Sequence, residues 1–102
     1  MKLRDIAHSR AGDKGEVLNL SLIAFRPEDY ALLEKHVTAE CVRAHFAGVV
    51  QGKVIRYTLP SLNAMNFVLE KALGGGVTRA LSLDPHGKCM SSVLLDIEIP
   101  NE

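Results

Sequence analysis

The sequence predicts an α+β domain, a two-layer sandwich with two helices on one face of a mostly antiparallel sheet. Residues 17–25 place Leu18, Leu20, Leu22 and Ala24 on one face of an extended chain and Asn19 and Ser21 on the other, which is typical of a half-buried strand. Residues 27–46 instead carry apolar side chains at helical spacing. Proline and glycine residues divide the remaining chain into short segments, which we interpret as further strands and one more helix. The predicted order of elements is ββαβαββ.

Length and composition restrict the class of protein. The 102 residues are predicted to form one domain, residues 1–102, and an apolar content of 47% is enough for one core. Twelve basic and twelve acidic residues balance, and aromatics make up only 5%, which argues against a general nucleic-acid or membrane-surface role. No run approaches the roughly 20 apolar residues of a membrane span, and two cysteines are too few for a disulfide framework. We therefore expect a cytoplasmic protein with no nucleic-acid or membrane partner.

Two strands separated by a polar loop are expected at the start of the chain. Residues 2–8 alternate well enough for a strand, and residues 17–25 give a stronger pattern. The buried face of the second strand is predicted to hold Leu18, Leu20, Leu22 and Ala24. Residues 9–16 contain two glycines and no apolar residue larger than alanine. We predict that they form a loop projecting from one end of the sheet.

The helical region is predicted to contain two short helices. Pro27, followed by two acidic residues, is typical of a first helical turn. Thr38 is a candidate N-cap, so we expect a break near Val37, and Gly48 is expected to end the region. The residues predicted to face the sheet are Leu33, Val37, Cys41, Val42 and Phe46.

The second half of the chain is predicted to add three strands and a helix. Residues 53–59 have the β-branched and aromatic content of a strand, and Pro60 closes it. Ser61 is a candidate cap for a helix over residues 62–73, which the glycines 74–76 end. Its predicted core stripe is Leu62, Met65, Leu69, Ala72 and Leu73. Residues 77–84 and 89–99 are predicted strands joined by a hairpin loop over 84–88, with Val93, Leu95, Ile97 and Ile99 facing the core.

The polar loop is the first candidate for a binding site. Gly12 and Gly15 free backbone N–H groups beside Arg10 and Lys14, which is a pattern that accepts anions. Asp13 adds a carboxylate, which either acts on a ligand or pairs with a neighbouring cation. The loop lacks the GxxxxGK[ST] phosphate pattern and leads into a strand, so a purely structural polar turn stays open as the alternative.

Two further segments extend this candidate site. Asn66, three residues after Asn63 in an otherwise apolar stretch, either binds a ligand or fixes a nearby backbone. The glycines 74–76 lead to Thr78 and Arg79, two donors that could contact a ligand, although a helix C-cap explains the glycines equally well. We predict that Arg10, Gly12, Asp13, Lys14, Gly15, Asn66, Thr78 and Arg79 form one anion-accepting corner.

No metal or cofactor is predicted. Cys41 with His45, and His86 with Cys89, have spacings that two metal ligands could share, but no CxxC or HExxH pattern accompanies them. His8 and Ser9 are adjacent on a strand and therefore point to opposite faces, so they do not form a nucleophilic pair.

One set of residues, spread over nearly the whole chain, matches a known family: 3–15, 38–40, Val42, 44–46, 56–57, 59–60, 62–69, 72–79, Asp84 and 86–88. On these residues the sequence resembles the small C-terminal domain of AtuA-like proteins, the acyclic terpene utilisation family. The resemblance implies a ferredoxin-like sandwich. It also implies a link to the breakdown of branched and terpenoid acyl-CoA compounds, with no established catalytic residue.

The resemblance supports two hypotheses about function. Because the family usually carries this unit behind a much larger domain, a free-standing unit implies an accessory or ligand-positioning subunit for a larger AtuA-like partner. The alternative is a small enzyme, of lyase or hydrolase type, acting on an acyl-CoA or another carboxylate. Its general base would be Asp13 or His8, and Arg10, Lys14 and Arg79 would hold the anion.

A homodimer is also predicted. A sheet with helices on one face leaves the opposite face uncovered, and that face is expected to carry Val17, Ile23, Phe25 and Leu94 among Asn19, Ser21 and Ser92. A second copy related by a twofold axis would cover it.

Overall fold

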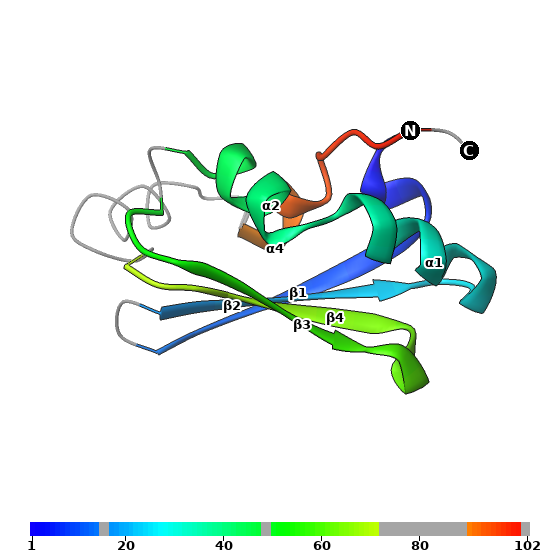
Figure 1. The fold of residues 1–102 in the computed structure, drawn as a ribbon, viewed down its shortest axis with the longest axis horizontal. Helices are drawn as coiled ribbons and strands as arrows, with labels where there is room; N and C mark the ends of the chain where they lie inside the picture. The colour runs from blue at the N-terminus through cyan, green and yellow to red at the C-terminus, as the bar shows by residue number, and fades with distance from the viewer. Residues whose placement is uncertain (15–16, 48–49, 72–89, 101–102) are drawn as a thin grey trace.

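The computed structural model describes residues 1–14, 17–47, 50–71 and 90–100, with the backbone alone for Asp13 and Lys14. Four strands form one antiparallel sheet in the order β1-β2-β4-β3: β1 (Ala7–Lys14), β2 (Val17–Ala24), β4 (Ala64–Leu69) and β3 (Val54–Leu59). The helices α1 (Pro27–His36), α2 (Ala39–His45) and α4 (Met90–Leu94) lie on one face of this sheet (Figure 1). The predicted α+β class, with helices on one face of an antiparallel sheet, is confirmed and is consistent with a ferredoxin-like domain.

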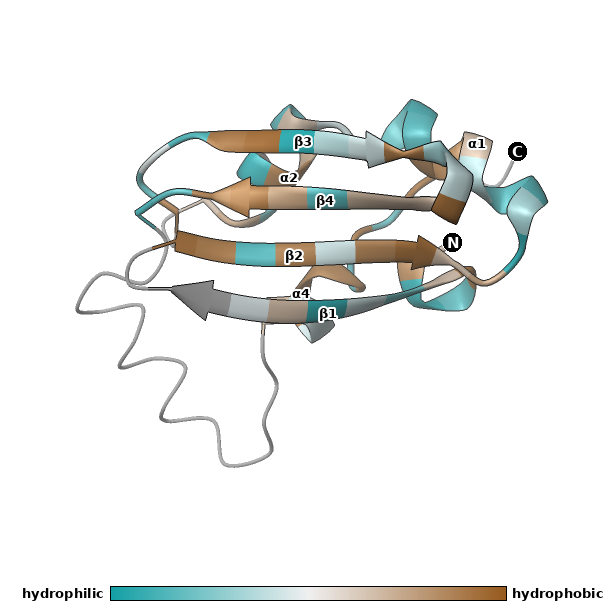
Figure 2. Cartoon of the chain, turned by 90° about the horizontal axis from the view of Figure 1, so that it is seen from below, coloured by the Kyte–Doolittle hydropathy of each residue, from teal (hydrophilic) through white to brown (hydrophobic). Residues whose placement is uncertain are grey.

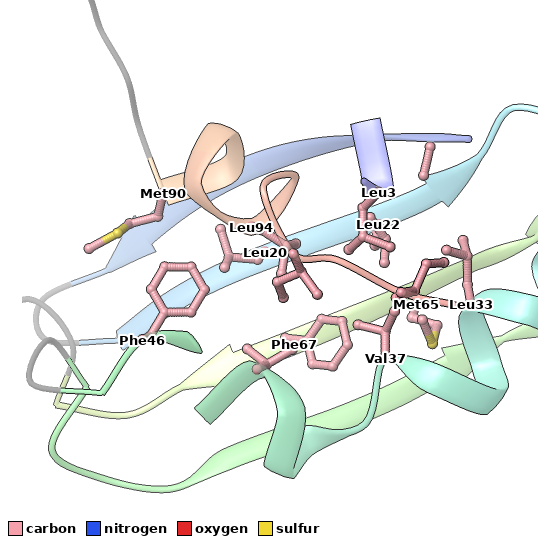
Figure 3. Packing of buried hydrophobic residues seen from close by; sticks show 14 of the residues in the cluster. Leu3, Leu20, Leu22, Leu33, Val37, Phe46, Met65, Phe67, Met90 and Leu94 are labelled. Carbon is pink, nitrogen blue, oxygen red and sulfur yellow. The ribbon is translucent and has the colours of Figure 1, made fainter. Parts of the chain in front are cut away.

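The central strand β2 shows most directly how the sequence builds the core. Leu18, Leu20, Leu22 and Ala24 are buried, and the residues between them are half-exposed, as the alternating pattern predicts. Figure 2 shows the sheet from its other side, with the helices behind it. The buried side chains of β2 pack against residues from the helices and from β4, among them Leu33, Val37, Phe46, Met65, Phe67 and Leu94 (Figure 3).

The break between α1 and α2 is confirmed. Pro27 occupies the first turn of α1, which ends at His36. Thr38 then caps α2 because its Oγ1 accepts a hydrogen bond from the backbone N of Cys41 at 3.1 Å. Val37, between the helices, is fully buried, so the break still fills the core. Cys41, predicted to face the sheet, is only partly buried at the margin of the core.

The predicted helix over residues 62–73 is wrong for its described part. Residues 60–62 form a 3-10 turn, η2 (Pro60–Leu62), and Asn63 adopts left-handed backbone angles, φ 52° and ψ 40°. β4 follows and pairs with both β2 and β3. Met65, Phe67 and Leu69 are fully buried, and their spacing of two residues is that of one face of a strand. Met65 and Leu69 are also four residues apart, which is the spacing of one face of a helix, so the sequence pattern fits both structures.

Two terminal predictions also need correction. Residues 2–8 contain a 3-10 turn, η1 (Leu3–Asp5), before β1 begins at Ala7. The predicted strand over residues 89–99 contains the helix α4, after which Ile97 and Ile99 are buried beside the N-terminal segment. Leu3 N donates to the Ile97 carbonyl at 3.0 Å, and Ile99 N donates to the Met1 carbonyl at 2.9 Å. The alternation of Ile97 and Ile99 therefore reflects pairing with the start of the chain rather than a place in the sheet.

The remaining predictions fall outside the described residues. They concern the end of the helical region at Gly48, the glycines 74–76, the strand over residues 77–84 and the hairpin loop over residues 84–88. Within the described parts, the observed order is ββααββα rather than ββαβαββ.

Contacts between distant residues fasten the helices to the sheet. Arg56 of β3 donates from Nη1 to the backbone carbonyls of Glu34, at 2.7 Å, and Val37, at 3.0 Å. His45 Nε2, at the end of α2, lies 2.7 Å from the carbonyl oxygen of Val93 in α4. The helical layer is therefore held by polar contacts as well as by the core, and no helix of the described residues lies on the opposite face of the sheet.

Candidate functional site

The candidate site is the face of the sheet that points away from the helices, which we call the open face. Strand alternation and the cross-strand register place a set of exposed or half-exposed side chains on it. These are His8, Arg10, Val17, Asn19, Ser21, Ile23, Phe25, Ile55, Tyr57, Leu59, Asn66 and Val68, with Gly12 among them. Figure 2 looks onto this face, with the strands in front of the helices.

One polar row crosses the whole sheet. Arg10 pairs with Ser21, Ser21 with Asn66, and Asn66 with Tyr57, so the row contains one residue from each strand. Neighbouring strands are about 4.8 Å apart, so the row is roughly 14 Å long. It presents a guanidinium, an amide and a phenol to solvent on an otherwise mostly apolar face.

Hydrogen bonds within the face order part of this row. Ser21 Oγ accepts from the backbone N of Arg10 at 3.0 Å and donates to its carbonyl oxygen at 3.3 Å. Asn66 Nδ2 donates to Asn19 Oδ1 at 3.2 Å. The Ser21 hydroxyl is therefore used inside the sheet. The Arg10 guanidinium, in contrast, makes no hydrogen bond or ion pair with any residue that the structure describes.

The large exposed hydrophobic side chains lie on the open face or at the end of the sheet where β2 and β3 finish. Phe25, Leu59 and Leu62 are 58%, 42% and 65% exposed, and Tyr57 is 52% exposed. Phe25 follows the last residue of β2, and Leu62 lies in η2, which joins β3 to β4, so these residues share one end of the sheet. His8 stacks on Phe25 with ring centroids 5.6 Å apart and an interplanar angle of 16°. We call Ile23, Phe25 and Leu59, with the neighbouring Leu62 of η2, the apolar end.

The structure brings together two of the predicted ligand residues. Arg10 and Asn66, 56 positions apart, lie in the same row on either side of Ser21. Gly12 lies one row away, opposite Asn19, while Asp13 and Lys14 pair with Leu18 and Val17 at the end of β1. Gly15, Thr78 and Arg79 lie outside the described residues, so the predicted corner is described only in part.

The predicted polar loop is wrong over residues 9–14, which belong to β1. An edge strand with one face open to solvent needs few large apolar residues, which explains its composition. Gly12 has no positive φ, and a Cβ built on it would meet no atom within 4 Å, so neither a turn nor crowding requires glycine there. The two candidate general bases, His8 and Asp13, lie far from each other. They are five residues apart on one strand, so their backbone positions are about 17 Å apart.

Sequence reasoning missed the contribution of β3 to this face. Ile55, Tyr57 and Leu59 alternate with Val54, Arg56 and Thr58, and this period of two was present in the sequence. The edge position of β3 was not visible in the sequence, so its exposed face was not recognised. Leu94 and Ser92, predicted to lie on the open face, belong instead to α4 on the opposite side, where Leu94 is fully buried.

The described residues show no grouping for metal binding. No three His, Cys, Asp or Glu side chains in the described ranges lie together as a ligand set. Partial burial raises the pKa of the Cys41 thiol above its ordinary value, which disfavours the thiolate form that binds metals. His45 contacts the Val93 carbonyl instead of Cys41.

Two hollows lie beside α2. One, of about 450 Å³, is lined by Glu40, Arg43, Ala44, Ala47 and Val50. The other, of about 190 Å³, is lined by Ala39, Glu40, Arg43, Lys53, Val54 and Ile55. None of the predicted site residues lines either hollow.

Comparisons with known proteins agree with the fold described above. Among the described residues, no helix has the length and apolar character needed to cross a membrane. Neither the curated proteins nor the solved structures compared with the chain gave a match. The family model of the AtuA ferredoxin-like domain matches residues 1–100. The chain therefore belongs to the AtuA ferredoxin-like domain family.

Proposed function

We propose that this protein is a cytoplasmic accessory subunit that docks on a larger AtuA-like protein through the open face of its sheet. The observation that carries the proposal is the asymmetry of the sheet. In the described part of the chain, α1, α2 and α4 cover one face, while the other exposes Phe25, Tyr57 and Leu59. Large exposed apolar groups gathered on one surface are typical of protein-protein contacts.

The resemblance to AtuA-like proteins supports a larger AtuA-like protein as the proposed partner. In that family the small unit usually accompanies a much larger domain, and a separate large subunit would provide the same arrangement from two chains. The process served would be the breakdown of branched or terpenoid acyl-CoA compounds. The small subunit would complete or position a site on the partner rather than carry the chemistry itself. A second copy of this chain is the alternative occupant of the open face.

Binding to the large AtuA-like protein from the same genome tests this proposal. Purified wild-type protein should bind it in calorimetry, and Leu59→Asp should weaken the complex about tenfold or more, because it puts a charge into an apolar contact. Ala47→Asp is the matched control, since Ala47 is exposed beyond the end of α2, on the helical side. Equal binding by Leu59→Asp and wild type would remove the open face from the proposal.

A further inference from the structure

The open face has a charge pattern that its apolar end does not explain. Within the bounds of the four strands, no outward-facing position of the described side chains holds an aspartate or glutamate, whereas β1 contributes Arg10. Glu70, half-exposed and one residue beyond β4, lies at the end of the sheet opposite the apolar end. The Arg10 guanidinium has no ion-pair partner among the described residues, while Arg4, Arg26 and Arg56 each bond to carboxylates or carbonyls. A partner that covers this face must therefore accept the hydrogen bonds of Arg10 or bury it without compensation, which is costly.

The surroundings of Arg10 leave room for an acceptor. Gly12 is the next outward-facing residue on β1, about 7 Å along the strand, and the space in front of its Cα is empty. Across from it, Asn19 uses its Oδ1 to accept from Asn66, so its Nδ2 is left without a partner among the described residues. The backbone at Gly12 thus has the Arg10 guanidinium on one side and the Asn19 amide donor on the other. Both groups donate hydrogen bonds that a carboxylate can accept.

Resting on the proposed docking function, we infer that the partner presents an aspartate or glutamate side chain to Arg10, over Gly12, while apolar side chains beside it cover the apolar end. The carboxylate sets the register of docking, and the apolar end supplies most of the buried area. A second copy fits this surface less well. Two open faces placed together would bring Arg10 of both copies into the interface, and among the described side chains no outward-facing position within the strands would supply a carboxylate. Glu70, one residue beyond β4, lies towards the far end of the sheet, about four residues along from the row that contains Arg10.

Charge variants of the full chain test the inference against the same purified AtuA-like protein. Arg10→Glu and Arg10→Met should each weaken binding about 30-fold or more, with the reversal the more severe. Arg43→Glu, an exposed arginine of α2, is the matched control and should bind like wild type. Gly12→Leu should also weaken binding, because it fills the space over the backbone, while Gly12→Ala should have a smaller effect. Far-ultraviolet circular dichroism checks that each variant is folded.

The outcomes separate this inference from the docking proposal. If Leu59→Asp weakens the complex while both Arg10 variants bind like wild type, docking stands and the carboxylate contact is overturned. If wild type does not bind the large protein, both are overturned. If sedimentation shows a wild-type dimer that Leu59→Asp dissociates, a second copy covers the face and the inference fails. The carboxylate contact is supported if affinity drops in the Arg10 variants and in Gly12→Leu but not in Arg43→Glu. It is supported further if an acid-to-arginine change on the partner restores binding to the Arg10→Glu variant.

Discussion

Arg56 donates a hydrogen bond from Nη1 to the backbone carbonyl of Glu34 at 2.7 Å, and so ties the edge strand β3 to the C-terminal turn of α1. The same nitrogen also reaches the carbonyl of Val37 at 3.0 Å. Carbonyls at the end of a helix lack partners within the helix and carry partial negative charge, so a cation is favoured there.

Arg56→Met should therefore lower the free energy of unfolding by about 1–3 kcal/mol, because it removes charge-assisted hydrogen bonds and leaves the carbonyls of Glu34 and Val37 without the donor from Arg56. Arg10→Met is the matched control and should change stability by less than about 0.5 kcal/mol, since Arg10 is exposed. Urea denaturation followed by circular dichroism measures both. Equal losses in the two variants would contradict the role given to Arg56.

The cap of α2 gives a second prediction. Thr38→Ala should lower the free energy of unfolding by about 1 kcal/mol, because the backbone N of Cys41 loses its acceptor. Thr38→Ser keeps a hydroxyl at the same position and should remain within a few tenths of a kcal/mol of wild type. Thermal and urea denaturation of the three proteins compare them. A serine variant as unstable as the alanine variant would mean that the methyl group, not the cap, matters.

Two glycines should respond in opposite directions to alanine. A Cβ at Gly52 would lie 2.7 Å from the carbonyl oxygen of Glu70, so Gly52→Ala should cost about 1–3 kcal/mol through backbone displacement. A Cβ at Gly12 would meet no atom within 4 Å, so Gly12→Ala should leave stability unchanged or raise it by about 0.5 kcal/mol. Denaturant midpoints measure both changes, and a destabilised Gly12→Ala variant would show that β1 is more crowded than described.

The pH dependence of stability should report on Tyr30. Burial, then the nearby charge of Glu34 and the hydrogen bond from the Tyr30 hydroxyl to that carboxylate, raise the pKa of Tyr30 above its ordinary 10.0. In the unfolded chain the phenol ionises first, so the free energy of unfolding should fall as pH rises from 10 towards the folded-state pKa.

Tyr30→Phe removes this group, so its free energy of unfolding should decline less steeply above pH 10 than that of wild type. Glu34→Gln removes the charge while leaving Tyr30 buried, and its slope should lie between the two. Denaturant titrations at several alkaline pH values measure the slopes. A Tyr30→Phe profile parallel to that of wild type would rule out this contribution.

The parts of the fold that the sequence predicted are those where one pattern has one structural meaning. The strict alternation of β2 and the combination of Pro27 with Thr38 both led to the observed elements. β4 was mistaken for a helix because Leu62, Met65 and Leu69 have helical spacing, while Met65, Phe67 and Leu69 also fit a strand. Pairing with β2 and β3, which are distant in sequence, decides between the two, and a local pattern contains no information about that pairing.

The candidate site was predictable only in its residue types. Arg10 and Asn66 stood out because their chemistry was unexpected in their surroundings, and the structure places them in one row. Their shared face was not predictable, since residues 9–14 were interpreted as a loop and Asn66 as helical. The apolar end was missed for a similar reason: Leu59 and Leu62 belong to a strand end and a turn, where an apolar side chain indicates nothing about which side of the sheet it occupies.

The hydrogen bond from Leu3 to Ile97 has a consequence for the order of folding. It closes a loop of about 94 residues, and the entropy lost on closing a loop grows with its length. The β1–β2 hairpin, whose strands are separated by two residues, meets no such barrier. Once β1, β2 and β4 have paired, the two ends of the chain lie much closer together than in the unfolded state. We therefore expect segment 97–99 to pair with residues 1–3 only after the sheet has formed.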